Sequence, residues 1–349
     1  MKKMKKILAL MLVAAMVFGL SACGGGDTAG DNDGDTAAGT ETIVWDFLDL
    51  DSASHPMVTL LNEWADEIYN QSNGQLKINI RVGGELPFTT AEYLDAVSAN
   101  SVQMAGCMIT AISSYLDAGG LPGSPYMTTD IDSFKTVMGV LDGYLNDELA
   151  EYGVFNAMTT FYPTQDVYGT GKVPASYTDL KGLKMRTSGA EQAKFWQKVG
   201  LVPTSIDASE VSTALNTNVI NAVTTATLAV DSNKWYESLD WVYMCNSMVI
   251  PVYVVVNNDA FNELPADVQE VFLSVTKEFS DSFPERMQEY SDKCLETLEN
   301  NGVQVVWATD EQKAELRDIA MPLWDEYAKG AGENAQKALA DVKAALALE

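Results

Sequence analysis

The sequence predicts an α/β protein of two lobes, each built on a doubly wound sheet, with a helical C-terminal region. Short apolar runs rich in β-branched residues alternate with amphipathic helical patterns, which is typical of largely parallel sheets. This alternation begins at Ile43 and begins again at Leu183. About 300 residues follow the N-terminal region, and the 47% apolar content of the chain is enough for two hydrophobic cores.

The N-terminus has the features of a secretory leader. Four lysines within Met1–Lys6 precede an apolar run from Ile7 to Leu20, which is too short for a transmembrane helix. The run ends in Leu20-Ser21-Ala22-Cys23, a lipobox pattern, so residues 1–22 are predicted to be a lipoprotein signal peptide and Cys23 the lipidated residue. The alternative is an ordinary secreted protein with a cysteine after its leader. The common register of Leu20, Ala22 and Cys23 favours the lipoprotein.

Residues 23–42 are predicted to be a flexible tether. Between Gly24 and Thr42 the chain is mainly Gly, Asp, Thr and Ala, and no large apolar side chain occurs before Ile43. Such a segment cannot bury enough surface to order itself.

The first lobe begins with a strand, a helix and a second strand, which are predicted over residues 43–48, 56–70 and 76–82. Pro56 fits the first turn of that helix. A loop over 83–87 leads to a helix that we expect Thr90 to cap, and residues 102–108 are a further strand.

The second lobe is predicted from a strand over 183–187, a helix over 191–199 ended by Gly200, and a strand over 202–206. Ser188 and Glu191 have the spacing of a capping box. A helix near Ser209 and strands over 219–225 and 249–256 follow, and the chain from Pro265 on is predicted to be a helical wrap.

The composition argues against several classes of function. The formal net charge of −27 argues against nucleic acid or an anionic bilayer surface as a direct partner, because phosphate binding needs a basic stripe. One histidine, His55, and no Gly-x-Ser-x-Gly elbow or phosphate-binding glycine loop leave an enzyme without positive support, and we expect no metal site or cofactor. At most one disulfide is available among Cys107, Cys245 and Cys294, and the pair is left open.

Arg186 is the strongest candidate for binding a ligand. It ends a predicted strand directly before a helix, and ligands of open α/β sheets bind at the carboxyl ends of strands. Its planar guanidinium can bind a carboxylate through two parallel hydrogen bonds. The alternative is a surface ion pair in a very acidic chain.

Several segments, in this order and spacing, resemble the DctP-type solute-binding subunit of tripartite ATP-independent periplasmic (TRAP) transporters. They are Asp179-Leu180-Lys181-Gly182-Leu183-Lys184-Met185-Arg186, Ser209-Glu210-Val211, Ala214-Leu215-Asn216-Thr217-Asn218, Lys234-Trp235-Tyr236-Glu237 and Glu263-Leu264-Pro265. The resemblance covers nearly all of the chain after the tether.

The resemblance implies a two-lobed periplasmic-binding-protein-like clamp that closes over a small organic acid and delivers it to membrane permease subunits. It implies lobe 1 over residues 43–163 and 252–291, and lobe 2 over residues 164–251 and 292–349. The arginine of the family that grips the carboxylate matches Arg186. The protein would lie outside the cytoplasm, bound to the membrane through the lipid on Cys23.

The resemblance also suggests further ligand-binding positions. Relatives that bind sialic acid have a second basic residue where this chain has Asp166, Asn where it has Thr225, and an aromatic residue where it has Ala208. These departures disfavour dianionic ligands and permit an amino or hydroxyl group near Asp166, although a solvated loop carboxylate is an equal alternative there. Asp49 is a candidate from a strand end, and the weaker candidates are Glu85, Tyr168 and Trp235.

Two other functions stay open on the sequence alone. The same fold serves sensory or accessory lipoproteins that dock to a signalling receptor. A secreted hydrolase or lyase that uses only acidic residues is the remaining alternative.

Overall fold

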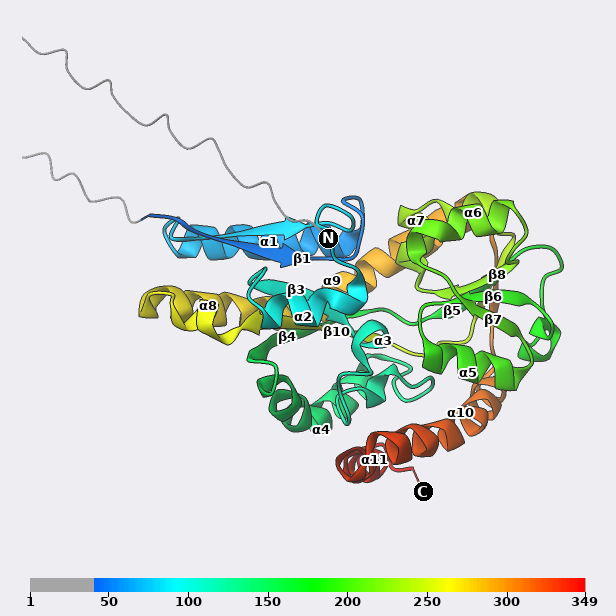
Figure 1. The fold of residues 1–349 in the computed structure, drawn as a ribbon. Helices are drawn as coiled ribbons and strands as arrows, with labels where there is room; N and C mark the ends of the chain where they lie inside the picture. The colour runs from blue at the N-terminus through cyan, green and yellow to red at the C-terminus, as the bar shows by residue number, and fades with distance from the viewer. Residues whose placement is uncertain (1–40, 349) are drawn as a thin grey trace, which may run out of the picture. The chain divides into compact units, whose positions relative to one another are not determined.

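The computed structural model describes residues 41–348. The predicted signal peptide, Cys23 and the tether up to Thr40 lie outside the described residues. Two sheets with their helices make up the described part, and they are drawn side by side in Figure 1. None of its helices is both long and apolar enough to span a bilayer.

The first sheet, sheet A, has five strands in the order β2-β1-β3-β10-β4. Its strands are β1 (Ile43–Leu48), β2 (Leu76–Arg81), β3 (Met104–Met108), β4 (Val154–Tyr162) and β10 (Ile250–Asn257). Its helices are α1 (Pro56–Gln71), α2 (Tyr93–Ser98), α3 (Ile109–Ile112), α4 (Ile131–Ala150) and α8 (Asn258–Asn262), with short 3₁₀ turns at Thr90–Glu92 and Leu121–Gly123.

The second sheet, sheet B, has six strands in the order β11-β9-β5-β8-β6-β7. Its strands are β5 (Asp166–Gly169), β6 (Lys184–Thr187), β7 (Val202–Ser205), β8 (Ala222–Thr225), β9 (Trp241–Met244) and β11 (Gln304–Trp307). Its helices are α5 (Ala190–Val199), α6 (Val211–Asn216) and α7 (Thr227–Ser232), with 3₁₀ turns at Tyr177–Leu180, Ala208–Glu210 and Trp235–Ser238.

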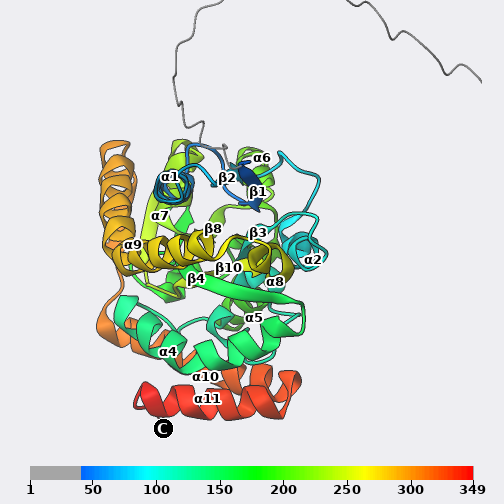
Figure 2. The ribbon, with the colours of Figure 1, turned by 90° about the vertical axis from the view of Figure 1, so that its left-hand side faces the viewer.

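Three long helices form the C-terminal region: α9 (Ala266–Asn300), α10 (Asp310–Ala331) and α11 (Glu333–Ala345). The first half of α9 packs in the core of sheet A, where Phe272 contacts Trp64, and its last turns place Leu298 in a core of sheet B. α11 packs against α10 and α4, below the sheets in Figure 2. The expected helical wrap is therefore confirmed, with the edge strand β11 inserted into it.

Local sequence explains why these elements form where they do. α1 begins where the His55 ring nitrogen accepts a hydrogen bond from Met57 N at 3.1 Å, and Pro56 occupies the first turn. All eight residues of β10 are buried, five of them valine or isoleucine, as suits a central strand covered on both faces. Gly200 ends α5 with a φ of 109°, a left-handed conformation that favours glycine.

The α/β class and the eleven predicted strands and helices of the two lobes are present, with ends shifted by a few residues. The sheets were expected to be largely parallel but are mixed, because β10 runs antiparallel to β3 and β4, and β5 antiparallel to β8 and β9. The predicted capping box is wrong: Ser188 Oγ donates to Gln192 Oε1 at 3.0 Å, and Gly189 precedes α5. Thr89, not Thr90, precedes the 3₁₀ turn, and its N–H donates to Glu92 Oε2.

The chain passes between the sheets in two short segments that lie side by side, residues 163–165 and 245–249. Gln165 N donates to Met248 O at 2.7 Å, and Ser247 N donates back to Gln165 O at 2.9 Å. This paired crossing, together with α9, joins the two sheets and places their strand ends on either side of a common cavity.

Candidate functional site

A cavity of about 450 Å³ lies between the two sheets, a size suited to a small organic molecule. The residues that line it come from loops and helix starts of both sheets. The polar ones are Asp51, Ser52, Thr89, Thr90, Tyr93, Tyr162, Gln165, Arg186, Ser188, Asp207, Ser209, Thr225 and Asn233. The apolar ones include Leu50, Phe88, Met108, Ala208, Ala226, Trp235 and Ile250.

Arg186 lies on the sheet B wall, in β6 between β7 and β8. Its side chain is only 7% exposed, and Nε donates to Ile206 O at 2.8 Å, which fixes the guanidinium plane. Burial lowers the pKa of Arg186 to about 10, while Asp207 acts in the opposite direction, so the side chain stays cationic at neutral pH. Within residues 41–348 its Nη groups have no hydrogen-bond partner, so they are available to a ligand.

The charge of Asp207 acts on Arg186, but the Asp207 carboxylate accepts its hydrogen bonds from other groups. Asp207 Oδ1 accepts hydrogen bonds from Ser209 N at 3.0 Å and Ser209 Oγ at 2.8 Å, and these bonds lower the pKa of Asp207. Arg186 forms no ion pair with Asp207 or with any other acid of the described chain. Because burying an unpaired charge is costly, the arrangement indicates a site for an anionic partner.

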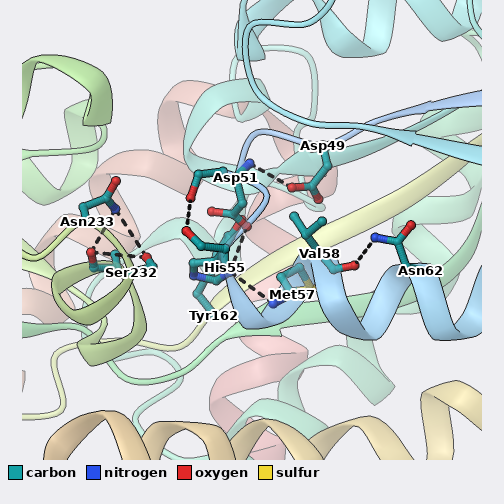
Figure 3. Close-up of polar contacts among 12 residues, drawn as sticks. Asp49, Asp51, His55, Met57, Val58, Asn62, Tyr162, Ser232 and Asn233 are labelled. Atoms are coloured by element: carbon teal, nitrogen blue, oxygen red, sulfur yellow. Dashed lines mark hydrogen bonds and ion pairs between the residues drawn. The ribbon is translucent and has the colours of Figure 1, made fainter. Parts of the chain in front are cut away.

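A cluster of titratable side chains lies on the sheet A wall, shown in Figure 3. Tyr162 OH donates to Asp51 Oδ2 at 2.6 Å, and His55 Nδ1 lies 3.3 Å from the same oxygen. The backbone N–H of Asp51 donates to Asp49 Oδ1 at 2.8 Å. Asp51 and Tyr162 line the cavity, whereas Asp49 and His55 lie behind them.

Burial dominates the proton equilibria of this cluster. It raises the pKa of Asp51 to about 7, against the hydrogen bond from Tyr162, which lowers it. It raises the pKa of Asp49 to about 7 as well, with Asp51 adding to the effect. Burial lowers the pKa of His55 to about 4, so the imidazole is neutral at physiological pH.

Three of the site residues predicted from the sequence line the cavity: Arg186, Thr225 and Ala208. Trp235, a weaker candidate, lines it too, although its side chain is 98% buried in a core of sheet B, leaving 2% exposed.

Asp49 and Asp166 are not among the lining residues. Asp49 holds the backbone of Asp51, and Tyr93 OH donates to Asp49 O at 3.1 Å. Asp166 lies opposite Thr225 in sheet B, where its Oδ1 accepts from Asn246 N at 2.7 Å. Its Oδ2 is buried and has no partner within the described chain, and burial raises its pKa to about 7.

The remaining two candidates also lie away from the cavity. Tyr168 is fully buried and shares a hydrogen bond with Thr227 Oγ1 at 2.8 Å, and Glu85 is exposed on the loop after β2.

Asp51, Tyr162 and Asn233 line the cavity but were not predicted from the sequence. Asp51 lies three residues beyond the carboxyl end of β1. The rule that ligands bind at the carboxyl ends of strands, which selected Arg186 and Asp49, therefore also points to the loop that carries Asp51. No comparable signal marks Tyr162, at the end of the unpredicted strand β4, or Asn233, which follows α7.

Comparison with known families decides the identity of the fold. Residues 49–330 match the DctP model, described as bacterial extracellular solute-binding protein, family 7. The chain belongs to this family. The resemblance found in the sequence is therefore confirmed, and the DctP family is one of solute-binding proteins that act outside the cytoplasm.

Individual DctP relatives are distant in sequence but similar in fold. The C4-dicarboxylate-binding periplasmic protein DctP of Vibrio cholerae is 22% identical over 290 residues, covering 80% of this chain and 84% of the relative.

Two solved structures are also similar. DctP6, a Bordetella pertussis extracytoplasmic solute receptor that binds pyroglutamic acid, has a TM-score of 0.81 at 24% identity, covering 86% of this chain and 100% of that one. The sugar acid binding protein DctPAm of Advenella mimigardefordensis, in complex with galactonate, has a TM-score of 0.78 at 16% identity, covering 87% and 99%. At these identities the likeness of the structures shows the shared two-lobed α/β fold.

Proposed function

We propose that this protein captures a small organic acid outside the cytoplasm and delivers it to a TRAP-type membrane transporter. The main support for this proposal is the environment of Arg186. Its guanidinium is buried without an ion-pair partner in the described chain, and its Nη groups are free at a cavity between the two sheets. A ligand carboxylate would accept paired, charge-assisted hydrogen bonds from the Nη groups of the guanidinium. Relatives of this chain bind acids: a C4-dicarboxylate, pyroglutamate and galactonate.

Thermal unfolding tests this role. Residues 41–349 form a compact unit of their own, so a protein that starts at Glu41 is suitable. We would screen pyroglutamate, galactonate, lactate and succinate against native protein, Arg186→Ala and the control Arg317→Ala, which removes an exposed arginine of α10. An acid present at a hundredfold its dissociation constant stabilises the native state by about 2.7 kcal/mol.

The expected result is a raised unfolding midpoint for native protein and the control, and none for Arg186→Ala. Truncating one partner of a buried charge pair costs at least about 2 kcal/mol, or roughly thirtyfold in affinity. Equal stabilisation of all three proteins by an acid contradicts the assigned role of Arg186.

We also propose that the protein is a lipoprotein anchored through Cys23, on the support of the leader and lipobox in the sequence. Expression in a bacterial host with Cys23→Ser as the comparison tests this. The native chain should fractionate with membranes and show the mass of a diacylglyceryl cysteine, and the variant should be released. Membrane association of both forms would contradict the anchor.

The lobe boundaries are a further proposal: residues 43–163 and 252–291 against residues 164–251 and 292–349. Nearly all of the strand residues support this division, since only Ile250 and Pro251 of β10 fall on the other side of it. The helix α9 crosses the boundary. If the lobes close on an acid, small-angle scattering should show a smaller radius of gyration on ligand addition, and an unchanged radius would count against closure.

A further inference from the structure

Asp51 is held by the protein in a way that leaves one carboxylate oxygen free. Its Oδ2 accepts from Tyr162 OH at 2.6 Å, its N–H donates to Asp49 Oδ1 at 2.8 Å, and its backbone O accepts from Gly83 N at 2.9 Å. Its Oδ1 has no hydrogen-bond partner within residues 41–348, and the side chain is 11% exposed where Asp51 lines the cavity.

The loop that carries Asp51 is closely packed. A Cβ atom at Gly83 would lie 2.4 Å from Leu50 O, so glycine is required for the two loops to meet. Figure 3 shows Asp51, His55 and Tyr162 close together, and Asn233, which follows α7, lies to one side of them. Asp51, Tyr162 and Asn233 line the same cavity. The Oδ1 atom is therefore a preorganised acceptor rather than a mobile surface group.

The same arrangement occurs at Arg186 on the opposite wall. There, Nε is fixed by Ile206 O at 2.8 Å and the Nη groups are left without a partner in the described chain. Each wall thus fixes one atom of a charged side chain and leaves its remaining polar atoms for a ligand. Arg186 and Asp51 form no ion pair with each other, so neither satisfies the other.

We propose that Asp51 is the second anchor of the site, and that the solute is a small acid carrying a hydrogen-bond donor in addition to its carboxylate. The donor is a hydroxyl, an amide N–H or an ammonium group, and Asp51 Oδ1 accepts its hydrogen. This inference rests on the proposed function, because Arg186 must hold the carboxylate.

The charges at the cavity favour a monocarboxylate over a dicarboxylate. Arg186 is the one basic side chain among the described lining residues, and the acids Asp51 and Asp207 line the same cavity. Above about pH 7, where Asp51 and Asp49 are ionised, a second ligand carboxylate at the sheet A wall would be repelled by Asp51 and by Asp49 behind it. A donor group there gains a charge-assisted hydrogen bond instead.

Calorimetric titration at pH 8 with a matched pair of acids tests the proposal. L-Pyroglutamate and cyclopentanecarboxylate share a five-membered ring and a carboxylate and differ in the lactam amide, and lactate and propionate differ in one hydroxyl. The proteins are native, Asp51→Asn, Asp51→Ala, Tyr162→Phe, Arg186→Ala, and the control Asp66→Asn on the exposed face of α1. Near-ultraviolet circular dichroism checks that each variant is folded.

Native protein and Asp66→Asn should bind the donor-bearing acid of at least one pair about tenfold to a hundredfold more tightly than its analogue, the range for a hydrogen bond to a charged group. Asp51→Ala should abolish this preference, and Asp51→Asn and Tyr162→Phe should reduce it. Tyr162→Phe is informative because it removes only the hydroxyl that positions Asp51, and its effect should vanish in an Asp51→Ala background.

The outcomes separate the two proposals. If native protein binds both members of each pair equally and Arg186→Ala binds neither, the carboxylate site stands and the second anchor is overturned. A preference that survives in Asp51→Ala overturns it as well. If Arg186→Ala binds every acid as native protein does, or no acid binds native protein, the proposed function fails and the second anchor fails with it.

Discussion

The affinity for a donor-bearing acid should fall as the pH is lowered from 8 to 5. Only the ionised form of Asp51 has both oxygens free to accept, Oδ2 from Tyr162 and Oδ1 from the ligand donor, and the pKa of Asp51 is raised to about 7 by burial. At pH 5, two units below that value, about one Asp51 in a hundred is ionised. Because apparent affinity scales with the competent fraction, the dissociation constant should rise by about a hundredfold.

Apart from Asp49, the groups around Asp51 keep one protonation state across this range. His55, with its pKa lowered to about 4, stays neutral across the range, and the pKa of Tyr162 is raised well above 10, so its hydroxyl remains a donor. Asp49 titrates near 7 like Asp51, but it lies behind the cavity wall and holds the Asp51 backbone. The carboxylate of the ligand itself, with an ordinary pKa of about 3.5, stays ionised at pH 5.

Isothermal titration at four pH values, in two buffers of different ionisation enthalpy, measures both the affinity and the protons exchanged. Native protein should release close to one proton per acid bound at pH 6, and Asp51→Asn should show weaker binding that varies little with pH. A dissociation constant that is flat from pH 5 to 8, or an equal slope in Asp51→Asn, would refute the reasoning.

Three further outcomes are expected. Gly83→Ala places a Cβ 2.4 Å from Leu50 O, so it should lower the free energy of unfolding by about 1–3 kcal/mol and weaken acid binding. Its control, Gly139→Ala, lies on the exposed face of α4 with open space around it and should raise the free energy of unfolding by about 0.5–1 kcal/mol in chemical denaturation. Burial raises the folded-state pKa of Asp166 from its ordinary 3.8 to about 7. Its contribution to stability is therefore full below about pH 4 and is lost as the pH rises through 7, and Asp166→Asn should flatten the fall in unfolding midpoint between pH 4 and 7. The described cysteines, Cys107, Cys245 and Cys294, are free and buried. A thiol reagent should therefore react only slowly with the native protein starting at Glu41, and with three thiols after unfolding. A fast reaction with the native protein would contradict this.

The strand and helix pattern was predictable wherever apolar periodicity is strong, as in β1, α1 and β10. No element was assigned between residues 109 and 182, although α4 and β4 lie there. α4 contains Gly139 and Gly143, two poor helix formers on its exposed side, and the helix is stabilised by packing against α11 and β4. Tertiary packing of this kind leaves little trace in a local window of sequence.

Strand direction was not predictable from periodicity. A buried strand reads as the same apolar run whether its neighbours are parallel or antiparallel, so the placement of β10 between β3 and β4 depends on the three-dimensional path of the chain.

Part of the site followed from strand ends, and part depended on side-chain direction. The rule for α/β sheets found Arg186 and the loop after β1, but it selected Asp49 and not Asp51. The two carboxylates are two residues apart, and the loop turns so that Asp49 faces the backbone of Asp51 while Asp51 faces the cavity. The turn depends on Gly83, more than thirty residues away, and such a contact is invisible in the local sequence.

The position of β10 constrains the order in which the protein can fold. This strand bridges β3 and β4, yet it follows every strand of sheet B except β11 in the sequence. A chain growing from its N-terminus therefore reaches residue 249 with β4 still separated from the other three strands of sheet A, while five of the six strands of sheet B are already available. Sheet A closes only through contacts between distant segments, which slows folding. Although sheet A begins first in the sequence, we expect sheet B to form first and sheet A to close afterwards, when β10 pairs with β3 and β4.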